Sequence, residues 1–190
     1  MRRLVVGISG ASGVLYGVRL LEALRTVPDV ETHLVVSKGA ELTLRLETDR
    51  SLQSVQALAH VVHDNANLAA SISSGSFPAL GMAVVPCSMK SLAQIALSLN
   101  DNLLTRAADV TLKERRKLVI VPRETPLHLG HLRHMTALAE TGAVILPPAP
   151  SFYHGPQTIM DIVDQTVGKV LDQFGLEHDL FRRWSGAHGA

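Results

Sequence analysis

The chain has 190 residues, of which 46% are hydrophobic and 18% are charged, and its formal net charge is +1 at pH 7. This length and hydrophobic content suffice for one compact domain with a full core. The near-neutral balance excludes an overall field that would hold the chain on nucleic acid or on an anionic membrane. The low charged fraction and a mean hydropathy of +0.20 indicate that other subunits cover part of the surface, so we expect a homo-oligomer.

The location expected for the chain is the cytoplasm. Its one cysteine, Cys87, excludes an intramolecular disulfide framework and favours a reducing compartment. No apolar run reaches the ~18 to 20 residues that a membrane span requires. Arg2 and Arg3 precede an apolar stretch that is short and interrupted by glycine, which argues against a secretory signal. Aromatic residues make up only 4% and do not alternate with basic ones, so no nucleic-acid partner is expected.

A glycine-rich turn follows the first apolar run. Residues 4–13 read LVVGISGASG, with Gly7, Gly10 and Gly13 spaced three apart, and a helical apolar pattern continues to Leu24. Glycines let the backbone turn sharply while its N–H groups face an anion at the start of a helix. The spacing differs from the dinucleotide fingerprint Gly-x-Gly-x-x-Gly, so it favours a mononucleotide phosphate.

Apolar, strand-like runs recur along the chain with helical patterns between most of them. They lie at 4–8, 33–36, 82–85, 118–121 and 143–146, and a turn-rich connection covers 71–81. This alternation predicts βαβ units, a parallel sheet and helices on both faces, which is a three-layer α/β sandwich. Ligands of such sheets bind beyond the carboxyl ends of the strands.

Serines stand at several of these expected strand ends. Ser9, Ser12, Ser37 and Ser88 each follow an apolar run or its turn. Any one of them is readily explained as a helix N-cap or a turn residue. Their coincidence at successive ends of one sheet favours hydroxyls that bind phosphate or ribityl oxygens of a single ligand.

Charged residues near the strand ends have two interpretations. Arg106, Asp109 and Lys113 share one helix face, which is either a solvated helix end or a site for a second phosphate. Arg123 and Glu124 follow an apolar run, and they form either an exposed ion pair or a ligand clamp with a general acid.

Tyr153 and Lys169 also have two interpretations. Tyr153 lies in a proline-rich loop, and Lys169 lies off the apolar stripe of the following helix. Each side chain either packs against the protein or binds a phosphate, and the sequence pattern does not distinguish these two interpretations.

Histidine and cysteine do not indicate a metal site. His128, His131 and His134 are three apart, but His134 rotates away from the shared helix face and the segment contains no carboxylate. Cys87 lacks a signature for nucleophilic catalysis and is most simply a small buried apolar residue.

Six short motifs occur in order and together resemble the UbiX flavin prenyltransferase family, close to its enterobacterial members. They are GISGASG at 7–13, Ser37-Lys38, Pro86-Cys87-Ser88, RAAD and LKERR within 106–116, PRETP at 122–126 and FYH at 152–154. Each motif alone is weak, whereas the six together span roughly residues 3–184.

The resemblance implies a Rossmann-like, flavodoxin-type subunit that assembles into a dodecamer with FMN bound between subunits. It implies one domain over 1–190, and we expect the C-terminal helix and tail, about 156–190, to pack on neighbouring subunits. The implied reaction transfers the dimethylallyl group of dimethylallyl monophosphate to reduced FMN, at N5 and then C6. The product, prenylated FMN, is a cofactor for UbiD-type decarboxylases.

The resemblance also implies roles for individual residues. FMN contacts are expected from Gly10, Ala11, Ser12, Ser37, Ser88, Met89, Lys90, Ser91 and Arg123. The chain lacks the Asp-rich motif with which common prenyltransferases hold Mg²⁺, so we expect no metal, and cationic side chains must stabilise the leaving phosphate. The expected set is Arg106, Lys113, Tyr153 and Lys169 for that phosphate, with Glu124 in proton transfer or positioning. Some relatives carry Arg at position 169, so the geometry at that phosphate contact stays open. Trp184, Tyr153 and the flavin itself are open candidates for shielding the allyl cation.

Two other functions remain as alternatives from the sequence. One is an aromatic-acid decarboxylase that acts directly on its substrate. The other is a non-catalytic FMN carrier or partner-binding module. The first requires CO₂ release without a partner enzyme, and the second requires FMN binding without consumption of dimethylallyl phosphate.

Overall fold

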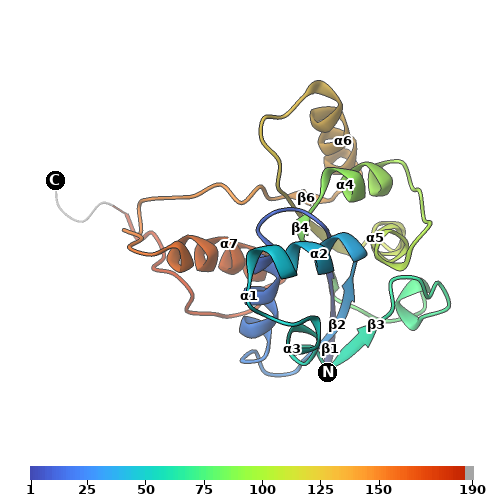
Figure 1. Cartoon of the computed structure of the whole chain (residues 1–190), viewed down its shortest axis with the longest axis horizontal. Helices are drawn as coiled ribbons and strands as arrows, with labels where there is room; N and C mark the ends of the chain where they lie inside the picture. The colour runs from blue at the N-terminus through green and yellow to red at the C-terminus, as the bar shows by residue number, and fades with distance from the viewer. Residues whose placement is uncertain (187–190) are drawn as a thin grey trace.

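The structure is a computed structural model that describes residues 1–186. Its centre is a six-stranded parallel sheet with the order β3-β2-β1-β4-β5-β6 (Figure 1). The strands are β1 (Arg2–Ile8), β2 (Val30–Val36), β3 (Val61–His63), β4 (Gly81–Cys87), β5 (Lys117–Pro122) and β6 (Val144–Ile145). The helices are α1 (Val14–Leu24), α2 (Lys38–Glu47), α3 (Leu52–Gln56), α4 (Met89–Ala96), α5 (Leu103–Lys113), α6 (Leu129–Glu140) and α7 (Ile159–Gln173), with the 3₁₀ helix η1 at Ser71–Ser73.

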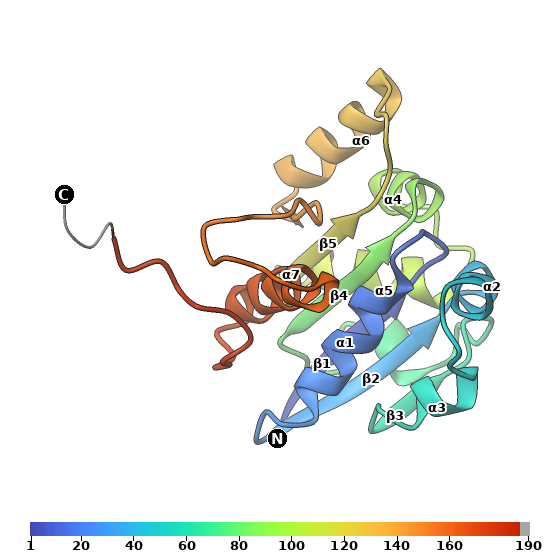
Figure 2. The same cartoon turned by 60° about the vertical axis from the view of Figure 1, so that its left-hand side comes forward.

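The central strands are apolar because helices cover both of their faces. In β1, Leu4 and Val6 pack with α1 and α7, whereas Val5 between them packs with α4 and α5 on the other face. Figure 2 shows α7 lying alongside α1. Successive side chains of a strand point to opposite faces, so a strand buried on both sides has no polar positions to display. The predicted parallel α/β sandwich is confirmed.

The strand order reverses between β1 and β4. The chain builds outward from β1 through β2 to β3, then returns to β4 and builds outward in the other direction. The helix after β1 packs on one face and the helix after β4 packs on the other. The two following loops therefore diverge and leave a crevice at the carboxyl edge, where ligands of this fold class bind.

The edge strands differ from the sequence prediction. The strand β3 was not predicted, because it has only three residues and exposes Val62, so no apolar run marks it. The predicted run at 143–146 forms a strand only at its centre, β6. The helix η1 lies within the stretch 71–81 that was expected to be irregular. Short edge strands are half exposed and carry a weak pattern.

Helix α7, in the C-terminal part of the chain, packs against the core of the same chain. Val163, Val167 and Val170 are buried in the core shared with α1. At the start of α7, Ile159 is 76% exposed, and Trp184 near the chain end is 64% exposed. The expectation that 156–190 packs on neighbouring subunits therefore concerns these exposed side chains and not the buried stripe of α7. Positions 187–190 of that expectation lie outside the described residues.

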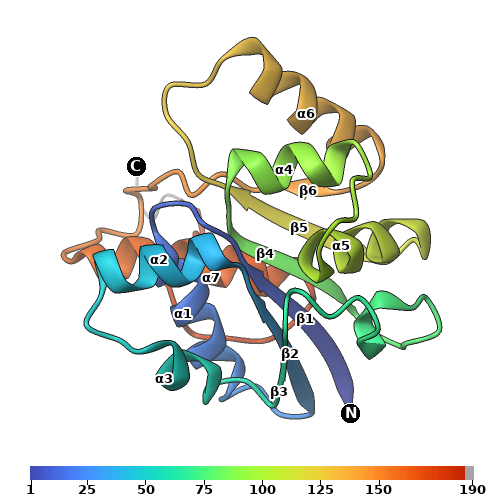
Figure 3. The same cartoon turned by 45° about the vertical axis from the view of Figure 1, so that its right-hand side comes forward.

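Helix α6 lies at the periphery of the molecule, on the outer side of α4 (Figure 3). It packs on α4, and of its own residues only Leu138 is buried. Leu129 and Leu132 are exposed on it. Within residues 1–186, every helix is too short or too polar to cross a lipid bilayer.

Candidate functional site

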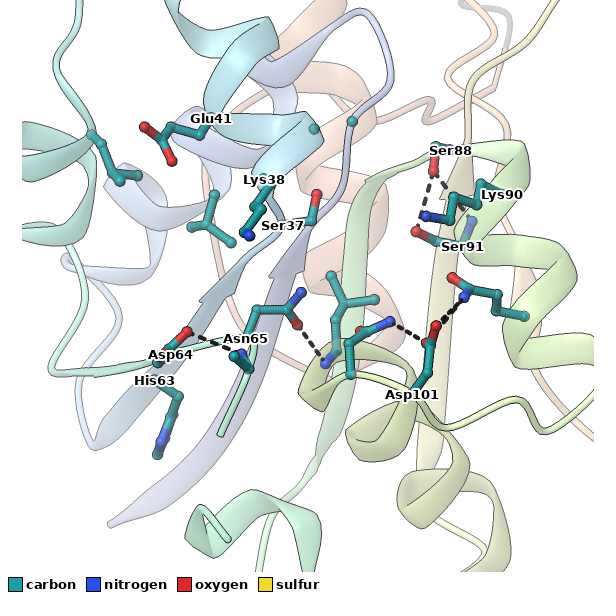
Figure 4. A pocket seen from close by; sticks show the side chains of 18 of the residues that line it. Ser37, Lys38, Glu41, His63, Asp64, Asn65, Ser88, Lys90, Ser91 and Asp101 are labelled. Atoms are coloured by element: carbon teal, nitrogen blue, oxygen red, sulfur yellow. Dashed lines mark hydrogen bonds between the residues drawn. The ribbon is translucent and has the colours of Figure 1, made fainter. Parts of the chain in front are cut away.

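A cavity of about 830 Å³ opens at the carboxyl edge, in the crevice between β1, β2 and β4 (Figure 4). Its lining includes five of the residues expected to contact FMN. They are Gly10, Ser37, Ser88, Lys90 and Ser91. The remaining members of that set, Ala11, Ser12, Met89 and Arg123, do not line it. The cavity therefore brings together residues that follow three different strands.

Two helix N-termini converge on this cavity. Ser37 caps α2 by accepting the N–H of Ala40 at 3.1 Å, and Ser88 caps α4 by accepting the N–H of Ser91 at 3.2 Å. The two interpretations of these serines are thus compatible, since they are N-caps and also line the cavity. First-turn N–H groups and the helix dipoles favour an anion at such a place. Lys38 and Lys90 add positive charge to the lining, which also carries the carboxylates of Glu41, Asp64 and Asp101.

Gly10 permits the first turn to approach α2 closely. A Cβ on Gly10 would lie 2.7 Å from the carbonyl carbon of Gly39, closer than side-chain atoms approach backbone. The two glycines thus face each other at the rim of the cavity. Only residues without side chains allow this contact, which explains the glycine in the turn after β1.

Ser9 does not face a ligand, contrary to the expectation from the strand ends. It is fully buried, donates to the carbonyl of Pro86 at 3.2 Å and accepts the N–H of Ser88 at 2.7 Å. Its one donor and one of its two acceptor lone pairs are used in joining the end of β1 to the end of β4. Ser9 therefore shapes the crevice from inside the fold.

The N-terminus of α1 already holds a carboxylate. Glu47, at the end of α2, accepts the N–H of Gly13 at 2.8 Å and that of Val14 at 3.2 Å. The glycine-rich turn attracts an anion, as its sequence predicts, but that anion belongs to the same chain. No local pattern could identify Glu47, because it is far along the chain from the turn. The N-termini of α2 and α4 are thus the better candidates for a ligand phosphate.

Arg123 and Glu124 lie at the carboxyl end of β5 with exposed side chains. The backbone N–H of Arg123 donates to the carbonyl of Cys87 at 3.2 Å, which fixes the pair beside the end of β4. Burial raises the pKa of Tyr16, and the Arg123 guanidinium partly opposes that rise, so Arg123 acts electrostatically on α1. Glu124 accepts the N–H of Thr125 at 3.0 Å. Within residues 1–186 its other carboxylate oxygen has no hydrogen-bond partner, and the side chain is exposed.

Arg106 and Lys113 share one face of α5, as their spacing predicts. Arg106 donates to the carbonyl of Ser73 at 3.1 Å and pairs with Asp109 at 3.2 Å, while Lys113 pairs with Glu114. Lys113 ends α5 just before β5 begins, and β5 begins at the amino edge of the sheet. Glu124 follows β5 at the opposite edge. One chain therefore does not bring Lys113 and Glu124 together.

Tyr153 lies at a second, smaller hollow of about 280 Å³, formed with the chain end. Its ring meets that of Trp184 edge to face, with centroids 6.0 Å apart. His154 and Arg183 also line the hollow, and Nε2 of His154 is buried without a protein partner. Lys169 does not line it, and its Nζ lies 3.5 Å from a carboxylate oxygen of Asp172.

His128 lies directly before α6 and serves as its N-cap. Nδ1 of His128 accepts the N–H of Gly130 at 3.0 Å and so caps α6, and its ring lies 3.6 Å from that of His131. Across residues 1–186, His, Cys, Asp and Glu form no group of three or more arranged to hold a metal ion.

The thiol of Cys87 is predicted to be unreactive in the native protein. Burial raises its pKa to about 12, so the nucleophilic thiolate is scarce at mildly alkaline pH. We expect iodoacetamide to leave the folded protein unlabelled and to add a single label after unfolding in guanidinium, as intact mass would record. Native protein that is alkylated as fast as a free thiol would contradict the buried position.

Known proteins share both the sequence and the fold of this chain. The Flavoprotein family matches residues 1–171. The flavin prenyltransferase UbiX of Escherichia coli (strain K12) is 65% identical over 189 residues, which cover 98% of this chain and 100% of that protein. The crystal structure of AnUbiX (PadA1) in complex with FMN and dimethylallyl pyrophosphate matches with a TM-score of 0.96 at 52% identity, over 98% of this chain and 99% of that one. A dodecameric FMN-dependent UbiX-like decarboxylase from Escherichia coli O157:H7 matches with a TM-score of 0.95 at 56% identity, over 97% and 100%.

Proposed function

The chain belongs to the UbiX flavin prenyltransferases, and we propose that it transfers the dimethylallyl group of dimethylallyl monophosphate to reduced FMN, at N5 and then C6. The observation that carries the proposal is 65% identity over essentially the whole length of a flavin prenyltransferase. The six motifs of the sequence fall within that length. The relative bound to FMN and a dimethylallyl donor supports the same pair of substrates.

The large cavity fits the phosphate and ribityl chain of FMN. The capped N-termini of α2 and α4 supply N–H groups, and Ser37, Ser88 and Ser91 supply hydroxyls on the same lining. Lys90 adds a charge that favours a dianionic phosphate. Four of the expected FMN contacts do not line the cavity, and we assign them to the part of the flavin that extends beyond it. They are Ala11, Ser12, Met89 and Arg123. When bound, reduced FMN supplies the nucleophilic N5 and C6 positions.

The leaving phosphate requires charge stabilisation as the allylic C–O bond breaks. Cationic and phenolic donors would supply it in place of a metal. The hollow beside Tyr153 offers the phenol and Arg183, and we assign Tyr153 and Lys169 to the donor phosphate. Glu124, which presents a free carboxylate oxygen at the carboxyl edge, would take up or position the proton that the flavin releases on closing the new ring.

Arg106 and Lys113 are proposed to serve a site formed with another copy of the chain. Their face of α5 leads to the amino edge of the sheet, away from Glu124. A dodecameric relative at 56% identity supports an assembly in which such faces meet. One guanidinium, of Arg106, and one ammonium, of Lys113, on a single helix face suit a phosphate ester. FMN would then lie between subunits.

Anaerobic incubation with reduced FMN and dimethylallyl monophosphate tests the proposed reaction directly. The expected result is a flavin whose mass has increased by one C5 unit, with phosphate released in equal amount. A parallel incubation with dimethylallyl pyrophosphate determines which donor is used. Unchanged flavin with both donors would reject prenyl transfer, and bound FMN without donor consumption would favour a carrier.

Direct decarboxylation is the second candidate, because the 56% identical dodecamer is described as a decarboxylase. Purified protein that releases CO₂ from an aromatic acid, with no second enzyme present, would support it. We propose instead that a UbiD-type decarboxylase receives the product. Adding the reacted flavin to such an apoenzyme is then expected to restore its CO₂ release, whereas unreacted FMN should not.

A further inference from the structure

Asp172 on α7 is the centre of a polar cluster that holds the end of the chain. Arg183 donates to both of its carboxylate oxygens, at 2.7 and 3.1 Å. Nε2 of His178 lies 3.2 Å from the same carboxylate, and Nζ of Lys169 lies 3.5 Å from it. The Asp172 side chain is only 20% exposed. A bidentate arginine and a second donor on one shielded carboxylate define a fixed geometry.

The tautomer of His178 follows from its second contact. Its Nδ1 accepts the backbone N–H of Leu180 at 3.2 Å, so that nitrogen carries no proton. Nε2 therefore carries the proton and donates a hydrogen bond to Asp172, with Nη2 of Arg183 lying 3.3 Å from the same nitrogen. The ring is thereby fixed at both nitrogens, and it links α7 to the C-terminal segment, defined as residues 176–186.

A notch in α7 receives the same segment. A Cβ on Gly168 would lie 2.5 Å from carbon atoms of both His178 and Phe181, so the two rings occupy the space where a side chain would stand. The guanidinium of Arg183 lies 5.4 Å from the centre of the Phe181 ring. Shape and charge thus seat the C-terminal segment at the same place on α7.

The next residue after Arg183 is Trp184, whose ring meets Tyr153. We propose that Asp172 is a positioning residue for prenyl transfer: it anchors the C-terminal segment through His178 and Arg183 and so sets Trp184 opposite Tyr153. This inference rests on the proposed function, which puts Tyr153 at the donor phosphate. Asp172 touches neither substrate. It acts through the aromatic wall that Trp184 adds to the donor site and through the placement of Lys169.

The anchor is expected to hold throughout the neutral range. Hydrogen bonding from Arg183 lowers the pKa of Asp172, so its contribution is present above the ordinary carboxyl pKa of about 3.9. That contribution is lost only as the pH falls through the lower, folded-state pKa.

Asp172→Asn tests the anchor with two independent readouts. Trp184 is the only tryptophan in the chain, so the fluorescence anisotropy of the protein reports its motion, and we expect the anisotropy to fall in the variant. The kcat/KM for dimethylallyl monophosphate is expected to fall on the order of 10- to 100-fold, as a misplaced wall group would cause. The Kd for FMN should stay unchanged. Asp172→Glu should recover part of both signals.

Asp164→Asn is the matched control. Asp164 also lies on α7, its side chain is also 20% exposed, and it also pairs with an arginine, Arg19 at 2.6 Å. That pair joins α7 to α1, and although Arg19 lines a hollow together with His178 and Arg183, neither Arg19 nor Asp164 hydrogen-bonds to the C-terminal segment. The control variant should leave Trp184 anisotropy and donor kinetics unchanged. An equal effect of both variants would overturn the proposal, because it would reduce Asp172 to a general support of α7.

Arg183→Gln provides a second route to the same result. Because Asp172 holds Arg183 and also His178, the double variant should be no worse than Asp172→Asn alone. Additive losses, or an Asp172→Asn protein with normal anisotropy, would overturn the anchor. If the wild-type protein transfers no prenyl group, the proposed function fails, while the anisotropy comparison still decides whether Asp172 holds Trp184.

Discussion

Replacing Glu124 with Gln is expected to lower the kcat of prenyl transfer by ~100-fold or more, which is the range that general acid–base catalysis contributes. Glu124 stands at the carboxyl end of β5 with one carboxylate oxygen on the N–H of Thr125. An amide keeps the size and can keep this contact through its carbonyl oxygen, but it cannot accept a proton. FMN binding should be unchanged, because the large cavity is lined by other residues.

The measurement is single-turnover mass analysis of the flavin together with FMN titration. Glu140→Gln, an exposed glutamate at the end of α6, is the matched control and should turn over normally. Glu124→Gln protein that converts the flavin at the wild-type rate would remove Glu124 from the reaction. A variant that loses FMN as well would assign the residue to binding.

Two inactive variants are expected to recover activity when they are mixed in one assembly. Glu124→Gln and Lys113→Gln should each be inactive alone, since each removes one charged group from every site. Lys113 lies at the amino edge of the sheet and Glu124 at the carboxyl edge, so each site would take the two residues from different copies. Random mixing in equal amounts then leaves about a quarter of the sites with both native residues.

The mixed assembly is prepared by co-expression with two affinity tags and tandem purification. The control mixture combines Lys113→Gln with Arg106→Gln. Because those residues share one face of α5, a single copy supplies both to a site, and no site in the control mixture would be intact. No recovery in the first mixture would mean that Glu124 and Lys113 do not meet across copies. Recovery in both mixtures would mean that Arg106 and Lys113 reach a given site from different copies of the chain.

The structure puts Lys113 and Glu124 at opposite edges of the sheet, whereas the resemblance placed both beside one phosphate. The reason can be read in the chain. The apolar run 118–121 lies between them, and a strand carries its two flanks to opposite edges of a sheet. The i, i+7 spacing of Arg106 and Lys113 likewise determined their shared helix face. The meeting of Ser37 and Ser88 followed from parallel strands, whose carboxyl ends all lie at one edge.

The sequence did not reveal which hydrogen-bond partners its polar groups have in the folded protein. Ser9 resembled its neighbours Ser12 and Ser37, but its hydroxyl is used by Pro86 and Ser88. The α1 N-terminus looked open to a ligand, but Glu47 occupies it. These contacts join residues far apart in the chain, and a hydrogen bond between them leaves no periodic trace in the sequence.

The sequence by itself determined the parallel α/β architecture, the edge of the sheet at which the large cavity opens, and the family. It did so because burial on both faces of a strand and on one stripe of a helix imposes local, repeating patterns. The tertiary structure alone decided which N-termini have no carboxylate partner within the chain, and it brought Arg183 onto Asp172 and Trp184 beside Tyr153. Those outcomes depend on which side chain, distant in sequence, lies within hydrogen-bonding distance of a given donor or acceptor. Only the packed fold determines that pairing.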